Sequence, residues 1–268
     1  MTVINWKERL LPYEQVVEEL KIKFKGIQKE YKNLQIHSPI ESVEGRVKSI
    51  ASILEKADKK NIPIEHVFDK IEDIAGVRII CRFVEDIEKV VSLIYQRDGE
   101  DLTIIEEEDY IKNTKKSGYR SYHITISYPI MTIEGRKDIK GEIQIRTLAM
   151  NFWATIEHSL RYKYNGNIPE ELKERLHVCA EAAFKLDNEM TTIRDELLEA
   201  QKIVNLKNNL VNEILENLQN LYYIAKIEKV TQFNREFINL YNEGNIDKLF
   251  DFNRQLEVMT NLYKVRYN

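Results

Sequence analysis

The stretch from Ser117 to Arg146 constrains the fold most, because polar and apolar residues alternate through both of its halves. It opens with SGYRSYH, continues through an alternating apolar segment, turns near Glu134 and Gly135, and closes on EIQIRT. A period of two is typical of β-strands, and glycine favours a tight turn between them. The pattern therefore predicts a β-hairpin that brings the polar ends of its two strands together.

The second strand of this hairpin carries a polar face. Glu142, Gln144 and Arg146 alternate with Ile143 and Ile145, so three polar groups share one face while the isoleucines enter the core. Across the hairpin the first half supplies a phenol ring, a guanidinium and an imidazole, from Tyr119, Arg120 and His123. A surface strand shows the same alternation, but this combination of groups favours a site for phosphate chemistry.

Composition is typical of a soluble globular protein, with 43% hydrophobic and 31% charged residues in a chain of 268. The formal net charge of −4 argues against a generic binder of polyanions, so any basic site is local. Cys81 and Cys179 lie far apart and suggest neither a metal site nor a disulfide framework. No stretch reaches the length of a membrane span, and we expect a cytoplasmic protein without membrane contact.

Two amphipathic helices are predicted at the start of the chain, separated by an HSP sequence that breaks the helical pattern. In the second, residues 41–60, Lys48, Ser52 and Lys56 follow one another at intervals of four and Arg46 lies beside them. A solvated lysine face is one interpretation of this stripe. A rail that holds successive phosphates of a polyphosphate is the other.

Residues 75–83 predict a buried strand, because β-branched residues dominate the segment. Asp73 precedes this strand, and Arg78 and Arg82 interrupt it four residues apart on one face. An arginine is costly to bury without a partner. Two interpretations stay open: the arginines reach a cleft or an anion, or they form structural salt bridges.

A helix over residues 84–96 and a strand over residues 101–110 complete a β-α-β unit with the buried strand. The loop that follows ends at Gly118, a residue that allows tight turning. Its three lysines lead directly into the hairpin: Lys112, Lys115 and Lys116. Their position favours contact with phosphate over simple solvation.

The rest of the chain is predicted to be helical. One helix carries Asn151 and His158, whose imidazole is either structural or a ligand, and a second begins at Glu170. Apolar stripes then continue to the end and indicate helical packing or oligomer contact. We expect an α+β domain over residues 1–204, with a mixed β-sheet of about five strands flanked by helices, and an all-helical segment over residues 205–268.

Four separated segments resemble the synthetase domain of the RelA/SpoT family, specifically its stand-alone small alarmone synthetases of the RelQ type. They are GRVKSIASILEK, EDIAGVRIICRF, SGYRSYH and EIQIRTLAMNFWATIEHSLRYKY, in the order of the family. The resemblance implies a nucleotidyltransferase-like synthetase fold. It also implies transfer of the β,γ-pyrophosphate of ATP to the ribose 3′-hydroxyl of GDP, GTP or GMP, with release of AMP.

The same resemblance implies roles for single residues. Arg46 and Arg78 are expected to stack on adenine, and Lys48, Ser52 and Lys56 to follow the triphosphate. Asp73 is expected to ligate Mg²⁺ with help from Glu142, which also lies at the 3′-hydroxyl. The expected acceptor-binding residues are Lys112, Lys115, Lys116, Tyr119 for stacking on guanine, Arg120, His123 and Gln144.

Further implications concern regulation. The chain has no His-Asp dipeptide of the family's hydrolase, so synthesis alone is expected. The resemblance to RelQ-type proteins implies a homotetramer with a central cleft that binds pppGpp, and single-stranded RNA is a further candidate regulator. The residues that match this cleft are Lys21, Lys25, Glu41 and Asn151. Ser42, Gln28 and Glu44 depart from it, and a glutamate near a polyphosphate argues against activation by pppGpp.

Other functions remain open on sequence alone. A related enzyme that pyrophosphorylates another 3′-hydroxyl, on an adenine nucleotide or a tRNA end, fits the same polar groups. A non-catalytic module that binds nucleotides or RNA fits them less well, because it has no need of Asp73 and Glu142. A helical scaffold accounts for the C-terminal segment but not for the polar strand face.

Overall fold

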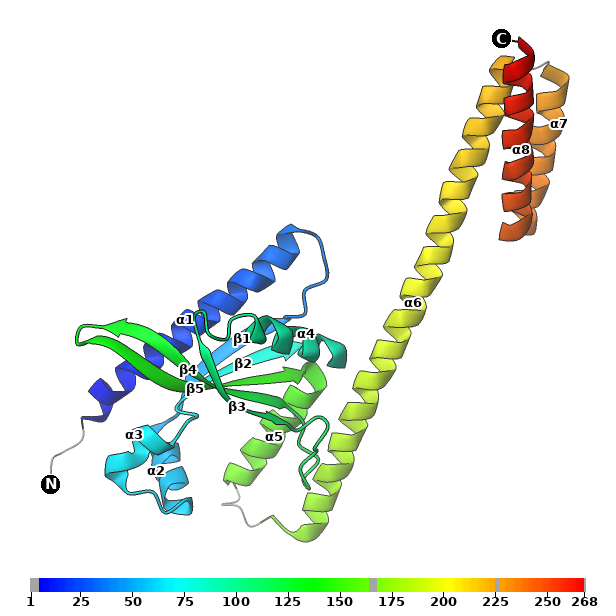
Figure 1. The fold of residues 1–268 in the computed structure, drawn as a ribbon. Coiled ribbons are helices and arrows are strands. Elements are labelled where there is room, and N and C mark those ends of the chain that lie inside the picture. Colours follow the sequence, from blue (N-terminus) through cyan, green and yellow to red (C-terminus); the bar gives the residue numbers. More distant parts are fainter. Residues whose placement is uncertain (1–4, 164–167, 225–226, 268) are drawn as a thin grey trace. The chain divides into compact units, whose positions relative to one another are not determined.

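The computed structural model describes residues 5–163, 168–224 and 227–267, and the side chains of residues 162, 163, 224, 227–229 and 263–267 lie outside this description. The chain forms two compact units, one up to Thr191 and one from Thr192 onward. Helix α6 (Glu170–Ile224) contributes residues to both units (Figure 1). The boundary predicted at residue 204 falls inside this helix and remains a prediction.

A five-stranded mixed β-sheet forms the centre of the first unit, as predicted. Its order is β1-β2-β5-β4-β3; β2 and β5 are parallel, and all other neighbours are antiparallel. The strands are β1 (Ser42–Val47), β2 (Ala75–Cys81), β3 (Thr103–Asp109), β4 (Tyr122–Thr132) and β5 (Gly135–Thr147). Helix α4 (Val84–Tyr95) leads from β2 to β3 at the edge of the sheet, and the hairpin β4-β5 lies between these two strands.

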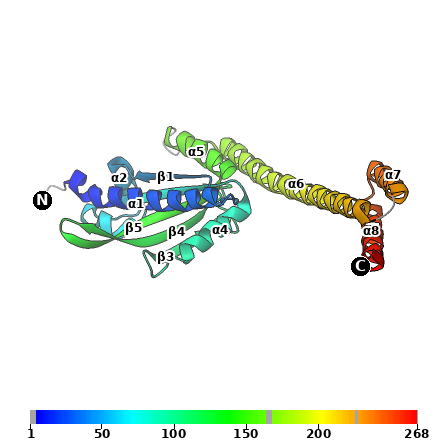
Figure 2. The same cartoon turned by 90° about the horizontal axis from the view of Figure 1, so that it is seen from above.

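Helices α1 (Trp6–Asn33) and α4 (Val84–Tyr95) lie along one face of this sheet (Figures 1 and 2). The apolar residues of α1 and α4 pack in one core with inward residues of the strands, among them Val77, Ile124 and Ile143. The helices of this unit are α1 (Trp6–Asn33), α2 (Ile50–Lys59), η1 (Ile64–His66), α3 (Val67–Lys70), α4 (Val84–Tyr95), α5 (Leu148–Lys163) and the first part of α6.

The helix predicted over residues 41–60 is wrong in its first half, which forms strand β1. Its apolar residues fit both the period of a helix and that of a strand, and pairing with β2 favours the strand. At Gly45 an added Cβ would lie 2.5 Å from Val17 Cγ1 of α1, so only glycine allows this close packing. Ser49 then caps α2, because its side chain accepts a hydrogen bond from the backbone N–H of Ser52.

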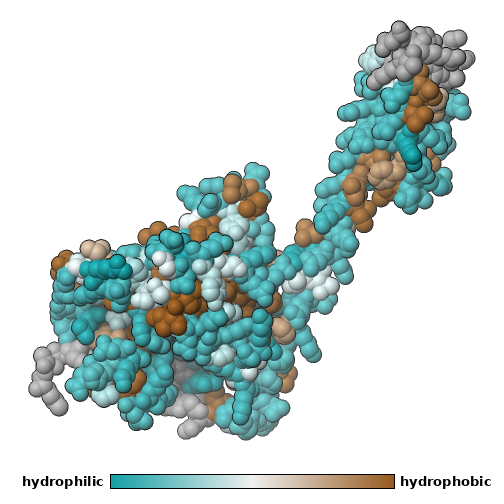
Figure 3. Space-filling model, viewed as in Figure 1, coloured by the Kyte–Doolittle hydropathy of each residue, from teal (hydrophilic) through white to brown (hydrophobic). Residues whose placement is uncertain are grey.

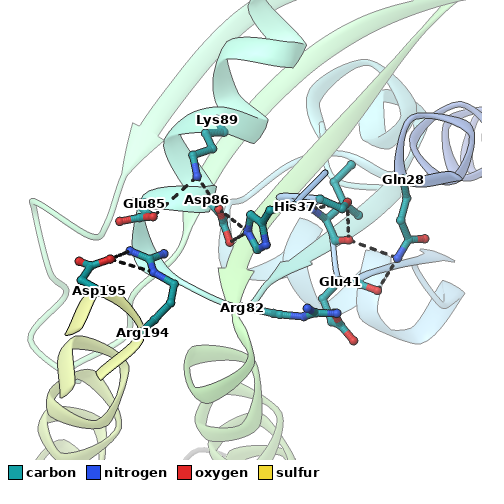
Figure 4. Close-up of polar contacts among 11 residues, drawn as sticks. Gln28, His37, Glu41, Arg82, Glu85, Asp86, Lys89, Arg194 and Asp195 are labelled. Carbon is teal, nitrogen blue, oxygen red and sulfur yellow. Dashed lines mark hydrogen bonds and ion pairs between the residues drawn. The ribbon is translucent and has the colours of Figure 1, made fainter. Parts of the chain in front are cut away.

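Strand β2 ends one residue before Arg82, so the alternation of the strand does not place Arg82 on the face of Arg78. Arg82 forms a salt bridge with Glu41, which is the second of the two interpretations given for these arginines. Arg78 lies within β2. Figure 4 shows this pair and a second group nearby, in which the buried carboxylate of Asp86 meets His37 Nε2 at 2.9 Å and Lys89 at 2.9 Å. These contacts tie the segment before β1 to Arg82 and to α4.

The predicted hairpin is confirmed. Strands β4 and β5 pair antiparallel, with His123 opposite Gln144 and Thr125 opposite Glu142. Gly135 adopts a φ of 103° where the chain turns back. Tyr119 and Arg120 precede β4, so the alternation of the strand does not determine the directions of their side chains.

The second unit is helical, as predicted, and contains the rest of α6 with α7 (Ile227–Glu243) and α8 (Ile246–Tyr267). The predicted apolar stripes form its core except for Val211, which is half-buried outside the cluster, and Leu215, which is 47% exposed, while Leu210 is buried. The buried cluster contains Leu210, Ile214, Leu218, Leu221, Val230, Leu249, Phe252 and Leu256. Inside it, Asn253 accepts a hydrogen bond from Asn217 and donates one to Glu213.

Figure 3 shows that hydrophilic residues cover most of the visible surface, with hydrophobic patches between them. Among the described helices, none is both long enough and apolar enough to cross a membrane.

Candidate active site

The polar face of the sheet gathers the candidate residues into rows. Period-two alternation places every second residue of β1, β2, β5 and β4 on the face opposite to α1 and α4. One row across the four strands is Glu44, Arg78, Gln144 and His123. The next row is Arg46, Gly76, Glu142 and Thr125. Strand register alone therefore brings together residues that are about 100 positions apart in the sequence.

A cavity of about 90 Å³ lies over the β1-β2-β5 part of this face. Gly76 forms part of its lining, and a Cβ built there would meet only Arg46 O within 4 Å, at 3.6 Å. A larger side chain at this position would extend into the cavity. The other lining residues are Glu44, Gly45, Arg46, Lys48, Asp73, Val77, Arg78, Glu142 and Gln144.

Asp73 is the first of two carboxylates in this cavity, and two lysines hold it. Asp73 Oδ2 lies 2.6 Å from Lys48 Nζ and 2.9 Å from Lys56 Nζ. Burial raises the pKa of Asp73, but the bonds and charges of the two lysines outweigh burial and keep that pKa below its ordinary value. Its second oxygen, Oδ1, is buried without a hydrogen-bond partner, which leaves one ionised oxygen for a cation.

Glu142 is the second carboxylate, and its neighbours fix its orientation. Oε1 lies 3.0 Å from His123 Nδ1, and Oε2 accepts a hydrogen bond from the Gln144 amide. Burial raises the pKa of Glu142, while His123 and Gln144 lower it further than burial raises it. A carboxylate that is ionised at neutral pH and held in one orientation can accept a proton from a hydroxyl group.

Tyr119, His123 and Arg146 form a network beside Glu142. The Tyr119 hydroxyl lies 2.7 Å from His123 Nε2 and accepts a hydrogen bond from Arg146 at 2.6 Å. Arg146 also donates to Gln144 Oε1 at 2.7 Å. The sequence placed Arg146 on the polar face without assigning it a role, although its alternation with Gln144 was the signal that it belongs here.

Guanidinium groups gather over the first two strands. Burial lowers the pKa of Arg78, and the nearby charges of Arg146 and Arg46 lower it further. Arg78 Nε is buried without a partner, and the closest acid is Glu44 at 3.6 Å. Burial also lowers the pKa of His158, as does the charge of Arg46, which favours a neutral imidazole there. This part of the site therefore favours an anionic or planar ligand.

Several predicted residues lie outside the cavity. Ser52 bonds to Ser49, Lys112 lies 3.6 Å from Asp109, and Lys115 lies over the ring of Tyr110. Lys116 lines a separate cavity of about 490 Å³ beside α5 and the start of α6. Arg120 pairs with Glu181 on α6, away from the polar face.

The donors for a divalent metal are few. Among residues whose side chains the structure describes, no three His, Cys, Asp or Glu side chains form a metal-binding group. The free oxygen of Asp73 and the carboxylate of Glu142 nevertheless face one cavity. This donor set fits Mg²⁺, which binds few protein carboxylates and takes its other ligands from phosphate and water.

The residues predicted for regulation lie on α1, before β1 and on α5, and two of them form salt bridges. Lys21 pairs with Glu18 at 2.6 Å, and Lys25 is exposed. The Glu41 carboxylate is paired with Arg82, and the Gln28 amide donates to the backbone carbonyl of Glu41 at 2.6 Å (Figure 4). Asn151 Oδ1 is buried and has no hydrogen-bond partner.

Comparison with known proteins identifies the family. Residues 45–167 match the model described as "Region found in RelA / SpoT proteins". The GTP pyrophosphokinase YjbM of Bacillus subtilis (strain 168) is 56% identical over 197 residues, which cover 74% of this chain and 92% of YjbM. This chain belongs to the RelA/SpoT family.

Solved structures agree with this assignment. The small alarmone synthetase 1 of B. subtilis bound to its product pppGpp is 55% identical, with a TM-score of 0.69 over 71% of this chain and 97% of that one. The same enzyme bound to AMPCPP has a TM-score of 0.64 at 52% identity and covers 72% of this chain and 98% of that chain. The resemblance to small alarmone synthetases and the synthetase fold expected from it are therefore confirmed.

Proposed function

We propose that this RelA/SpoT-family chain is a (p)ppGpp synthetase. It would transfer the β,γ-pyrophosphate of ATP to the ribose 3′-hydroxyl of GDP, GTP or GMP and release AMP. The observation that carries the proposal is the pair of ionised carboxylates, Asp73 and Glu142, in one cavity rimmed by arginine and lysine. The printed names of YjbM and of the solved relatives support it.

The donor half of the site is the β1-β2 side of the cavity. Arg46 and Arg78 present flat guanidinium groups for adenine, and Lys48 and Lys56 present ammonium groups for the triphosphate. When bound, Mg²⁺ would neutralise charge on the phosphate oxygens, and Asp73 with Glu142 would hold it. These groups lower the barrier by position and charge, so no covalent intermediate on the protein is needed.

The acceptor half is the β5-β4 side. Glu142 would accept the proton of the ribose 3′-hydroxyl while the 3′-oxygen attacks the β-phosphorus of ATP. The bond between that phosphorus and the bridging oxygen to the α-phosphate then breaks, and AMP leaves with the bridging oxygen. His123 and Gln144 hold Glu142 in place, and the Tyr119 ring would stack on the guanine.

We also propose a Mg²⁺-dependent homotetramer in the cytoplasm, with pppGpp or single-stranded RNA as candidate regulators. Glu44 departs from the residues that the resemblance places in the pppGpp cleft, and a carboxylate near a bound polyphosphate is unfavourable, so we expect pppGpp to raise activity little. Rates measured with and without added pppGpp test this, and a strong rise contradicts it.

The decisive experiment incubates the protein with ATP, Mg²⁺ and each guanine nucleotide and resolves the products by chromatography. Glu142→Gln keeps the size and shape of the side chain but removes the carboxylate that would accept the proton. Turnover should therefore fall about 10²- to 10⁴-fold, while ATP binding changes little. Glu134→Gln is the matched control, because Glu134 is an exposed glutamate at the far end of the same hairpin. Near-normal turnover of Glu142→Gln would refute the assigned role, and product with adenine acceptors alone would refute the guanine specificity.

A further inference from the structure

The turn that carries Tyr119 is docked against helix α6. Gly118 adopts a φ of 84°, and a Cβ added there would lie 2.5 Å from Ala180 Cβ and 2.9 Å from His177 Nδ1. The backbone of the turn therefore touches the helix at a distance that only glycine permits. The segment before β4 lies beside the first part of α6 (Figure 1).

Arg120 fastens this turn to the helix through three contacts. Its NH2 donates to Glu181 Oε1 at 2.8 Å, its NH1 donates to the carbonyl of Gly118 at 3.2 Å, and its guanidinium lies 4.3 Å from the ring centre of Phe184. Arg120 is only 9% exposed and does not line the cavity over the sheet. Its NH1 and NH2 groups donate to the turn and the helix, so these donors are not placed to bind phosphate there.

Tyr119 extends from the same turn towards the polar face. Its ring packs against the cluster of Trp153, Ala154 and Ala180, and its hydroxyl meets His123 and Arg146. The hydroxyl end of the ring is thus held by the sheet, and its backbone is held by the turn that Arg120 fastens. The position of the ring depends on both attachments.

We propose that Arg120 is a positioning residue for the acceptor nucleotide, acting through its pair with Glu181. The pair holds the Gly118 turn on α6 and so sets the Tyr119 ring before the acceptor binds. This inference rests on the proposed function, because it gives Tyr119 the guanine. A preordered ring avoids an ordering cost on binding, so loss of the pair should weaken acceptor binding more than ATP binding.

The test uses Arg120→Gln, Glu181→Gln and the exchanged double variant Arg120→Glu/Glu181→Arg. Each single variant should raise the KM for the guanine nucleotide about tenfold, because a charged hydrogen bond to a largely buried group is lost. The KM for ATP should change less than twofold. The exchanged variant should recover part of the loss. Arg136→Gln is the matched control, since Arg136 pairs with Asp138 at the exposed end of the same hairpin.

Amide hydrogen exchange supplies a readout that does not need activity. The Gly118 N–H donates to Lys115 O at 2.8 Å, and the Tyr110 N–H donates to Ser121 O at 3.0 Å, so peptides over residues 110–121 report on the turn. Exchange there should rise in both single variants and fall again in the exchanged variant. Peptides of β2 and β5 should be unchanged.

Two outcomes would overturn the inference. One is an acceptor KM within twofold of wild type in both single variants. The other is an equal rise of both KM values with faster exchange throughout the sheet, which is the result of a purely structural role. A wild-type protein that transfers nothing to any guanine nucleotide would refute the proposed function instead. In that case, unchanged exchange over residues 110–121 in the single variants would show that the Arg120–Glu181 pair does not hold the Gly118 turn.

Discussion

Asp187 is a buried carboxylate whose ionisation should make the first unit less stable at neutral pH. It lies on α6, is 6% exposed, and accepts a hydrogen bond from Thr147 Oγ1 at 2.6 Å. Thr147 also accepts a bond from the Met150 N–H at the start of α5. Burial raises the pKa of Asp187 to about 6, against an ordinary value of 3.8, although the bond from Thr147 lowers it.

The sign of the effect follows from this raised pKa. The contribution of Asp187 to stability is fully present below the ordinary pKa and is lost as pH rises through the pKa of the folded protein. A shift of about two units corresponds to about 3 kcal/mol in full, of which about 1.4 kcal/mol is lost between pH 5 and pH 8. Asp187→Asn removes this titration, so the free energy of unfolding of the variant relative to wild type should rise by about that amount over the same range.

Urea unfolding of both proteins at pH 5 and pH 8 measures this difference. Trp6 and Trp153 are the two tryptophans, so their fluorescence reports on the first unit. Asp138→Asn, at an exposed aspartate of the hairpin, is the matched control for the change from aspartate to asparagine. The same difference between Asp187→Asn and wild type at both pH values would refute the reasoning, whatever the absolute cost of placing an amide at this site.

Two further predictions concern packing. Gly45→Ala should lower the free energy of unfolding by about 1–3 kcal/mol, because its Cβ would lie 2.5 Å from Val17 Cγ1. Gly26→Ala should stabilise α1 by about 0.5–1 kcal/mol, because a Cβ there would meet nothing within 4 Å. Equal shifts of the melting temperature in the two variants would contradict both expectations. Leu218→Ala should destabilise the second unit by about 2–5 kcal/mol and Leu215→Ala by less than about 1 kcal/mol; hydrogen exchange over α7 and α8 that is equal in the two variants would contradict this.

Sequence periodicity predicted the parts of the site that lie on regular strands. Alternation in β5 placed Glu142 and Gln144 on one face, and pairing with β4 placed His123 beside them. It failed in β1, because the segment around Gly45 fits a helical and a strand period equally well. The strand forms because β2 offers an edge and α1 approaches closely, and both are tertiary facts that no local pattern contains.

The SGYRSYH segment shows a second limit of local sequence patterns. The family resemblance assigned both Tyr119 and Arg120 to the acceptor, and their adjacency in the sequence gives no signal that separates them. The turn at Gly118 lies outside the ladder of β4, and the choice between sheet and helix depends on partners about 60 residues later. Glu181 and Phe184 draw Arg120 to α6, whereas Arg146 and His123 hold Tyr119 at the sheet.

The charges of the cavity also explain why one aspartate suffices for the proposed metal-dependent donor site. Lys48 and Lys56 are both paired with Asp73 in the protein alone. A triphosphate that takes these lysines leaves a largely buried carboxylate without a cation, which is costly. The free Oδ1 of Asp73 makes a replacement cation at that position favourable. Binding of the donor and binding of the metal should therefore depend on each other, because the triphosphate takes the two lysines from Asp73 and the metal ion replaces their positive charge there.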